Sequence, residues 1–239
     1  MTSDSYYYSA EDLYNDLDPG SVQLLWTDPP FGTNKVQRGS KASYYDGPID
    51  ETLTLVTQLG LAAARLLTPS GVLAVCLDYR AVHKAHEILS LAGLYAQGEI
   101  IWHFELGGVA RKWWTNKHNT ILLFSKTQEP LFNYDKVPSV PRKAPRGTYD
   151  SDTRKANSVW NYTMGPTDPE RVGRANQKPL AIVEPFIEVH TNPGDLVVDP
   201  FAGSGTTAVA ARKLDRHFAI ADTDYEAISI TQQRLRKLA

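Results

Sequence analysis

The sequence predicts an α/β fold, a doubly wound and mostly parallel sheet that carries a basic irregular insertion. Short apolar runs alternate with segments that have apolar residues at helical spacing, first over residues 22–102 and again over 178–238. Between them, residues 106–175 break this alternation with Pro-, Arg- and Tyr-rich sequence, and such a long irregular stretch is usually functional or disordered. A chain of 239 residues is long enough for one domain of this kind with an insertion.

The elements before the insertion follow from these patterns in order. The first strand must end where two prolines follow Asp28, and a polar loop over 32–48 comes next. A helix is expected to stop at Thr68-Pro69-Ser70-Gly71, because a continuous apolar run typical of a buried strand begins there. The expected elements are strands at 22–26, 71–77 and 99–102 and helices at 51–67 and 81–92.

The remaining elements include one strand inside the irregular segment, at 120–124, and a regular α/β alternation after it. The expected elements of the last part are helices at 178–190, 207–214 and 225–238, and strands at 195–199 and 217–221.

Charge is unevenly distributed along the chain, although its net value is only -2. Residues 1–30 carry six acidic side chains and no Lys or Arg, whereas residues 111–178 carry thirteen Lys or Arg against six Asp or Glu. A protein that grips phosphates with one part only can have this layout, and so can a solvated basic loop region.

The segment Leu196–Thr207 combines an apolar strand, a turn of small residues and the start of a helix. Gly203 and Gly205 let a ligand approach the backbone closely, and the following helix N-terminus offers free N–H groups. Asp222 ends the next strand 17–19 residues later, where a carboxylate can accept hydrogen bonds from both ribose hydroxyls of a nucleoside. The segment favours a nucleoside cofactor, but alone it does not separate a methyl donor from a nicotinamide cofactor.

Asp28-Pro29-Pro30-Phe31 follows the first strand, at the carboxyl end where open α/β sheets place their chemistry. The amino group of adenine or cytosine is a poor nucleophile, because its lone pair is delocalised into the ring. The Asp28 carboxylate and the Pro29 carbonyl, held near that nitrogen, would favour a geometry with the lone pair free. Phe31 offers a flat face to an extruded base. Alone, such a tetrapeptide is more often a tight turn, so its meaning depends on the glycine turn downstream.

Together these motifs resemble the amino-methylating DNA methyltransferases, which carry a (D/N/S)-P-P-(Y/F) catalytic tetrapeptide and an F-x-G-x-G cofactor motif. Here the catalytic motif comes first, the basic segment second and the cofactor motif last, an order similar to the β group of that family. Members of this group modify the 6-amino group of adenine or the 4-amino group of cytosine. The similarity covers most of the chain outside the middle segment, including 20–31, 177–180 and 199–207.

The resemblance implies a fold of the S-adenosylmethionine-dependent methyltransferase type, with S-adenosylmethionine as cofactor and double-stranded DNA as partner. It divides the chain into a catalytic and cofactor-binding domain, 1–105 with 176–239, and a target-recognition insertion, 106–175. Two positions depart from the family: Ser9 aligns with a common aspartate, and Phe31 replaces the commoner Tyr. The implied cofactor-binding residues are Lys178, Asp199, Phe201, Ala202, Gly203, Ser204, Gly205, Thr206, Thr207 and Asp222.

The resulting hypothesis is base flipping, stacking on Phe31 and direct attack of the adenine amino nitrogen on the sulfonium methyl, without a metal or a covalent enzyme intermediate. Asp28 in place of Ser is similar to the adenine-modifying branch, and cytosine stays open. Two further alternatives are a nicotinamide oxidoreductase and a non-catalytic DNA-binding regulator. The two-glycine turn disfavours the first, and the intact catalytic tetrapeptide disfavours the second.

Basic and aromatic residues near the motifs have a structural and a functional interpretation. Trp113 and Trp114 could contact DNA or anchor a small core of the insertion, and a core position is favoured for at least one of them. Contacts to DNA are predicted for Lys35, Arg38, Lys41, Arg111, Lys112 and Lys117.

The remaining features concern compartment and assembly. The single cysteine, Cys76, excludes an internal disulfide, and its apolar neighbours predict a buried core thiol rather than a nucleophile. No stretch approaches the roughly 20 apolar residues that span a bilayer, and the acidic N-terminus does not resemble a signal peptide. We therefore expect a cytoplasmic protein of a bacterial, archaeal or phage-infected cell. The resemblance leaves a homodimer open.

Overall fold

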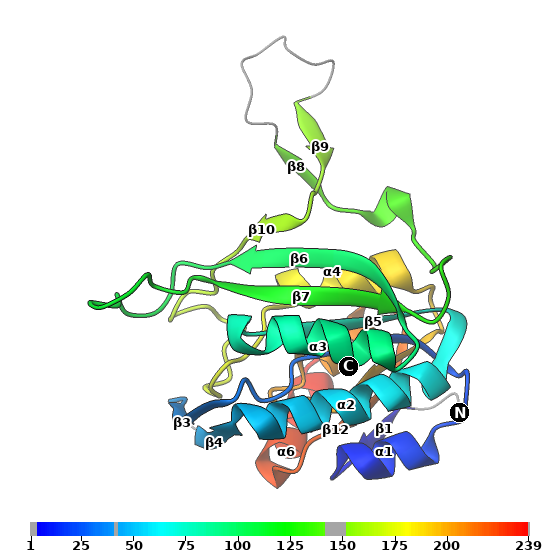
Figure 1. Cartoon of the computed structure of the whole chain (residues 1–239), viewed down its shortest axis with the longest axis horizontal. Helices are drawn as coiled ribbons and strands as arrows, with labels where there is room; N and C mark the ends of the chain where they lie inside the picture. The colour runs from blue at the N-terminus through cyan, green and yellow to red at the C-terminus, as the bar shows by residue number, and fades with distance from the viewer. Residues whose placement is uncertain (1–3, 41–42, 142–151, 239) are drawn as a thin grey trace.

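The computed structural model describes residues 4–40, 43–141 and 152–238, and within them it forms a central eight-stranded sheet (Figure 1). The strand order is β1-β12-β11-β2-β5-β7-β6-β10. Strand β7 runs antiparallel to both neighbours, and the other pairs of this sheet are parallel. The strands are β1 (Ser5–Tyr7), β2 (Val22–Thr27), β5 (Leu67–Leu77), β6 (Tyr95–His103), β7 (His118–Ser125), β10 (Val159–Asn161), β11 (Leu196–Asp199) and β12 (His217–Ala221).

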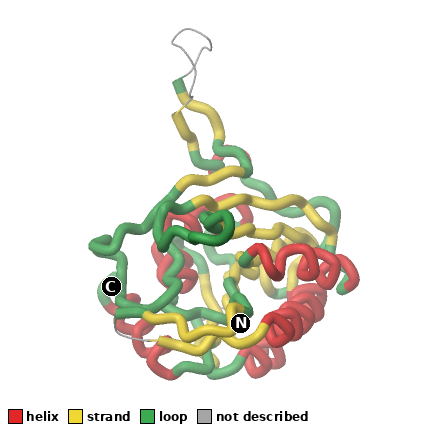
Figure 2. Tube along the Cα trace, turned by 60° about the vertical axis from the view of Figure 1, so that its left-hand side comes forward, coloured by secondary structure: helices red, strands yellow, loops and turns green. Residues whose placement is uncertain are grey.

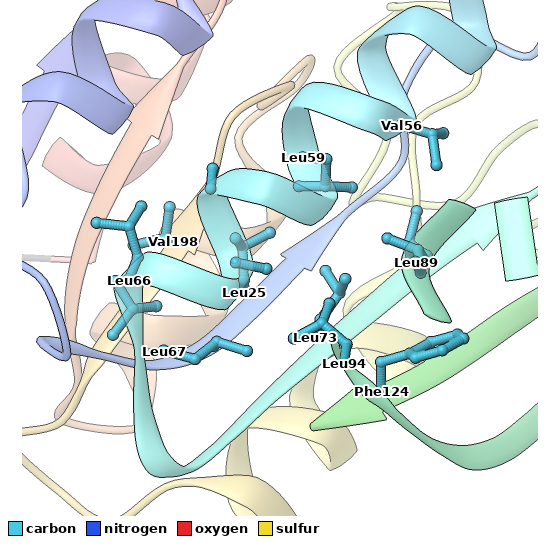
Figure 3. Close-up of a cluster of buried hydrophobic side chains, with 14 of the residues drawn as sticks. Leu25, Val56, Leu59, Leu66, Leu67, Leu73, Leu89, Leu94, Phe124 and Val198 are labelled. Carbon is cyan, nitrogen blue, oxygen red and sulfur yellow. The ribbon is translucent and has the colours of Figure 1, made fainter. Parts of the chain in front are cut away.

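Helices cover both faces of the sheet, which confirms the predicted doubly wound fold. One face packs against α1 (Ala10–Asp16), α2 (Ile49–Leu66) and α3 (Tyr79–Leu91), with Leu59, Leu66 and Leu89 in its buried core (Figure 3). The other face packs against α4 (Leu180–His190), α5 (Thr206–Lys213) and α6 (Tyr225–Arg236). Each fully buried aliphatic side chain contributes about 1.5–3 kcal/mol, so two such cores hold the sheet between its helical layers.

Several boundaries differ from the sequence prediction for local reasons. Residues 68–71 were expected to form a turn, but α2 ends at Leu66 and β5 begins at once at Leu67. Val22 pairs with Leu67 and Leu24 with Val72, so residues 68–71 lie within a shift of register between β5 and β2. The expected polar loop over 32–48 contains an antiparallel hairpin of β3 (Thr33–Arg38) and β4 (Ser43–Pro48).

The segment 106–175 contributes to the main sheet and also extends from it. Strand β7 lies between β5 and β6, and β10 forms the sheet edge beside β6. Between them, a 3-10 helix (Tyr134–Lys136) leads to an arm of two short strands, β8 (Ser139–Pro141) and β9 (Thr153–Lys155), which stands away from the body (Figures 1 and 2). Its role in target recognition stays a prediction.

The carboxyl ends of the parallel strands lie at one edge of the sheet. There β2 leads into Asp28, β11 ends at Asp199, and β12 leads into Asp222. Because β11 and β2 are direct neighbours, the two sequence motifs leave the sheet side by side. No helix within the described ranges has the length and apolar character of a membrane-crossing segment.

Candidate active site

A cavity of about 450 Å³ opens at this edge, and both predicted motifs line it. Asp28 and Pro30 come from the catalytic side, whereas Gly203 and Asp222 come from the cofactor side. Ser9, the residue that departs from the family at its usual aspartate, caps α1 and also lines this cavity. The other predicted cofactor residues that line it are Lys178, Asp199, Phe201, Ala202, Ser204, Thr206 and Thr207.

A second, smaller cavity of about 150 Å³ adjoins the first. Phe31 lines it, together with Trp102 and Phe104 of the β6 end. Residues 176–178 line both cavities, so they form the boundary between them. The flat face predicted for a base and the glycine turn therefore open onto two adjacent spaces.

The predicted catalytic tetrapeptide, residues 28–31, and the two residues after it are held by hydrogen bonds with residues that the sequence did not single out. Thr52 on α2 donates its hydroxyl to the Pro30 carbonyl at 2.8 Å. The fully buried Asp46 carboxylate accepts the backbone N–H groups of Gly32 and Thr33 at 3.0 and 3.1 Å. In the described part of the chain nothing donates to the Pro29 carbonyl, which leaves it able to accept a hydrogen bond from a substrate.

Asp28 forms an ion pair with Lys178, whose ammonium also donates to the Asn176 carbonyl at 3.1 Å and lies 4.9 Å from the centre of the Phe31 ring. Burial raises the pKa of Asp28, and the lysine beside it acts in the opposite direction. Burial is the largest single influence on the pKa of Lys178 and lowers it, but the opposing contributions, led by Asp28, together raise this pKa. Because Lys178 lines both cavities, this ion pair lies at the boundary between them.

Asp199 ties the two motifs together. One carboxylate oxygen accepts the Thr27 hydroxyl at 2.8 Å and the Phe201 N–H at 3.1 Å, and the other accepts the Thr207 hydroxyl at 2.6 Å. Burial raises the pKa of Asp199 to about 7. Since Thr27 directly precedes Asp28, this buried carboxyl fixes the catalytic strand against the glycine turn.

The glycine turn closes through Asp222 and Gly205. Asp222 accepts the Gly203 N–H at 2.8 Å and the Asp224 N–H at 2.9 Å, and each oxygen keeps lone-pair capacity for a further donor. Gly205 has φ 75°, and a Cβ there would lie 2.1 Å from the Thr231 hydroxyl oxygen of α6. The turn can therefore pack this closely only with glycine at 205.

Residues 174–178 complete the cavity wall, and of these the sequence motifs include Gln177 and Lys178 but not Arg174. Arg174, only 8% exposed, pairs with Asp224 at 2.6 Å beside Asp222. The Glu170 carboxylate accepts the Leu180 N–H at 3.0 Å and so satisfies the start of α4. The role of Arg174 gives no periodic signal in the sequence, because its partner Asp224 lies 50 positions away.

Of the residues predicted to contact DNA, four have exposed side chains, one bonds within the protein, and one lies outside the described residues. Lys35 and Arg38 are exposed on β3, and Arg111 and Lys112 are exposed between β6 and β7, whereas Lys41 lies outside the described residues. The Lys117 ammonium donates to the carbonyls of Glu105, Leu106 and Gly107, each at 3.0 Å, so its hydrogens are used within the protein.

Two interpretations of single residues have clear outcomes. Cys76 is fully buried, and burial raises the pKa of its thiol to about 12, which confirms a core thiol. Trp113 and Trp114 are 81% and 87% exposed, so the favoured core position is wrong for both. The loop that carries them projects from the body of the protein (Figure 1).

Comparisons with known proteins agree with this geometry. A family model described as DNA methylase, for N6 and N4 methyltransferases, matches residues 22–233. The type II methyltransferase M.HpaI of Haemophilus parainfluenzae is 28% identical over 92% of this chain, and M.BglII of Bacillus subtilis is 29% identical over 92%. The matches span 69% and 65% of the length of those two proteins.

Solved structures show the same fold. The PvuII DNA methyltransferase, described as cytosine-N4-specific, aligns with a TM-score of 0.76 at 19% identity, covering 97% of this chain and 86% of its own. The M1.HpyAVI-SAM complex aligns with a TM-score of 0.67 at 22% identity, covering 97% and 98%. From the family match over most of its length, the chain belongs to the N6/N4 amino-methylating DNA methylases.

Proposed function

We propose that this protein transfers a methyl group from S-adenosylmethionine to the 6-amino group of adenine in double-stranded DNA, with the target base extruded from the helix. The observation that carries the proposal is the shared cavity: Asp28 and Gly203 line one space, and Phe31 lines the space beside it. A donor in the first space and an acceptor in the second would meet at the boundary that residues 176–178 form, where Lys178 pairs with Asp28.

The first cavity, which Asp28 and Gly203 line, suits the cofactor in size and charge. Its volume of about 450 Å³ lies in the usual range for small-molecule sites. Carboxylates of Asp28, Asp222 and Asp224 and the cations Lys178 and Arg174 line it, which suits a cofactor that carries a sulfonium, an ammonium and a carboxylate group. Asp222 is in position to accept from ribose hydroxyls, and the Gly203–Gly205 turn is the surface along which the methionine part would lie.

The chemistry needs an amino nitrogen with an available lone pair. The bound cofactor supplies an electrophilic methyl group on sulfur. Asp28 and the Pro29 carbonyl would accept the two amino hydrogens, which pulls the nitrogen out of conjugation with the ring. The new N–C bond would form as the S–C bond to the methyl group breaks, with the thioether of the cofactor as leaving group. The surplus proton of the amine passes to Asp28 or to water.

Adenine is proposed over cytosine because Asp, rather than Ser, begins the catalytic tetrapeptide. The second cavity would hold the base against Phe31, with Trp102 and Phe104 as further apolar walls. The proposed location is the cytoplasm of a bacterial, archaeal or phage-infected cell, where DNA and the methyl donor are both present.

The test is to express the chain in a methylation-deficient host and to sequence the host DNA for modified bases. We expect N6-methyladenine within one sequence context, and its absence when Asp28→Ala is expressed at an equal level. The exposed Asp18→Asn serves as a matched control that should leave methylation intact. If the host DNA contains N4-methylcytosine instead, the target base is cytosine and not adenine. If the DNA is unmodified although the protein binds the cofactor, the protein is a non-catalytic regulator.

A further inference from the structure

The loop between β6 and β7 presents two adjacent indoles to solvent. Trp113 and Trp114 are 81% and 87% exposed, and Val109 in the same loop is 83% exposed. The loop extends past the carboxyl end of β6, on the same side of the molecule as the β3–β4 hairpin (Figure 1). A solvated position leaves a large apolar area uncovered, which is typical of a surface that binds a partner.

The partner must be anionic and must offer flat apolar faces. Residues 107–117 contain Arg111, Lys112 and Lys117 and no acidic residue. Arg111 and Lys112 directly precede the two indoles and are exposed as well. Cations beside aromatic rings match phosphates beside stacked bases, so the charge and the shape of this loop both fit nucleic acid.

The loop is braced at its base and turned back near its tip. Lys117 holds the three carbonyls of residues 105–107, and the Phe104 N–H donates to the Lys117 carbonyl at 2.9 Å. The Ala110 N–H donates to the Thr115 hydroxyl at 2.8 Å, and this bond links the two sides of the loop near its tip. A braced loop loses less conformational entropy when its side chains become ordered on a partner.

The position of the loop relates it to the site. Leu106, at its base, lines the cavity that contains Phe31. Leu106 and Gly107 also line a third cavity, about 710 Å³, whose other side includes Arg38 at the end of β3. The base of this loop therefore borders both the cavity that contains Phe31 and the cavity beside the β3–β4 hairpin.

We propose that Trp113 and Trp114 insert into the DNA duplex at the step that the target base vacates, with Arg111 and Lys112 on the adjacent phosphates. Stacking on an indole replaces the stacking that the neighbouring bases lose when the target leaves the helix. This inference rests on the proposed function, because it assigns a role during extrusion of the same base. The role of Lys117 is to brace the loop.

The experiment compares two duplexes that carry the sequence found methylated in the expressing host. In one the target base is paired, and in the other it lies opposite an abasic site, so that little unpairing remains to be done. For Trp113→Ala/Trp114→Ala we expect kcat/KM to fall about 10- to 100-fold on the paired duplex and less than about threefold on the other, in line with the usual strength of base–aromatic stacking. Leu91→Ala, equally exposed at the far end of α3, should change neither value.

A second readout does not depend on methyl transfer. With 2-aminopurine at the target position, the unmodified protein should raise its fluorescence, and the double variant should not. Equal losses on both duplexes, or no loss, would overturn the wedge role while leaving the proposed function intact. Failure of the unmodified protein to methylate either duplex would overturn both.

Discussion

Asp28 and Lys178, 150 positions apart in the chain, form an ion pair in which the lysine side chain is 5% exposed. The lysine acts against the burial that raises the pKa of Asp28. For Lys178→Met we expect this pKa to rise further, so that less Asp28 is ionised at neutral pH. The measured kcat should fall about tenfold or more at pH 7, and the acidic limb of the rate–pH profile should move to higher pH.

The control for this change is Lys213→Met, which removes an ion pair with Glu184 at the surface. It should leave the rate–pH profile where it is. An unmoved acidic limb in Lys178→Met would show that Asp28 does not need this counter-charge.

Gly205→Ala tests the close approach of the glycine turn to α6. The added Cβ would lie 2.1 Å from the Thr231 hydroxyl oxygen, and the alanine would also have to adopt φ 75°. We expect a loss of about 2–4 kcal/mol in the free energy of unfolding, the sum of backbone strain and overpacking. Weaker cofactor binding should accompany it, as measured by titration calorimetry.

Gly20→Ala is the matched control, because Gly20 has φ 69° but nothing within 4 Å of the added Cβ. Its cost, about 1 kcal/mol, measures backbone strain alone. If the two variants unfold at the same denaturant concentration, Thr231 yields without penalty and the steric argument is wrong.

Asp199 makes stability depend on pH. Its pKa is raised from 3.8 to about 7, so between these values the folded protein holds a proton that the unfolded chain has released. Its contribution to stability is therefore present at low pH and is lost as pH rises from about 4 to about 7. Relative to Asp199→Asn, the unmodified protein should lose melting temperature over this range and remain level above it. If the difference in melting temperature between the two proteins is the same at every pH from about 4 to about 7, the raised pKa of Asp199 is contradicted.

Asp46→Asn tests the support of the catalytic loop. Its carboxylate accepts two backbone N–H groups, and an amide would turn one oxygen into a donor that faces them. We expect about a tenfold lower kcat and a loss of about 1–3 kcal/mol in stability, typical of a buried hydrogen bond left unmade. The exposed Asp50→Asn in the first turn of α2 should have at most a small effect on either.

Periodicity predicted the sheet well because its central strands are buried on both faces and are apolar throughout. All six residues of β2 and all four of β11 are buried, and each strand is followed by a motif with its own residue signature. The short β1 was missed because three residues, Ser5–Tyr7, are too few to show an alternation.

The sequence predicted the site only where its residues are contiguous in the chain and form a recognisable motif. The roles of Asp46 and Arg174 depend on partners brought together by folding, and neither lies in a motif. Lys178 was assigned to the cofactor, yet its ammonium pairs with Asp28. Trp113 and Trp114 could not be placed, because two adjacent indoles among cations suit a small core as well as an exposed tip.

The pairing of β2 with β11 leaves the active site no tolerance for length changes in either strand. Leu24 lies opposite Val197 and Leu25 opposite Val198, so the two motifs emerge at matching heights. One inserted residue would advance the catalytic loop by about 3.3 Å and turn alternate side chains to the opposite face. Insertions and deletions among homologues should therefore gather in the β6–β7 loop and the β8–β9 arm, and spare the few residues before Asp28 and Asp199.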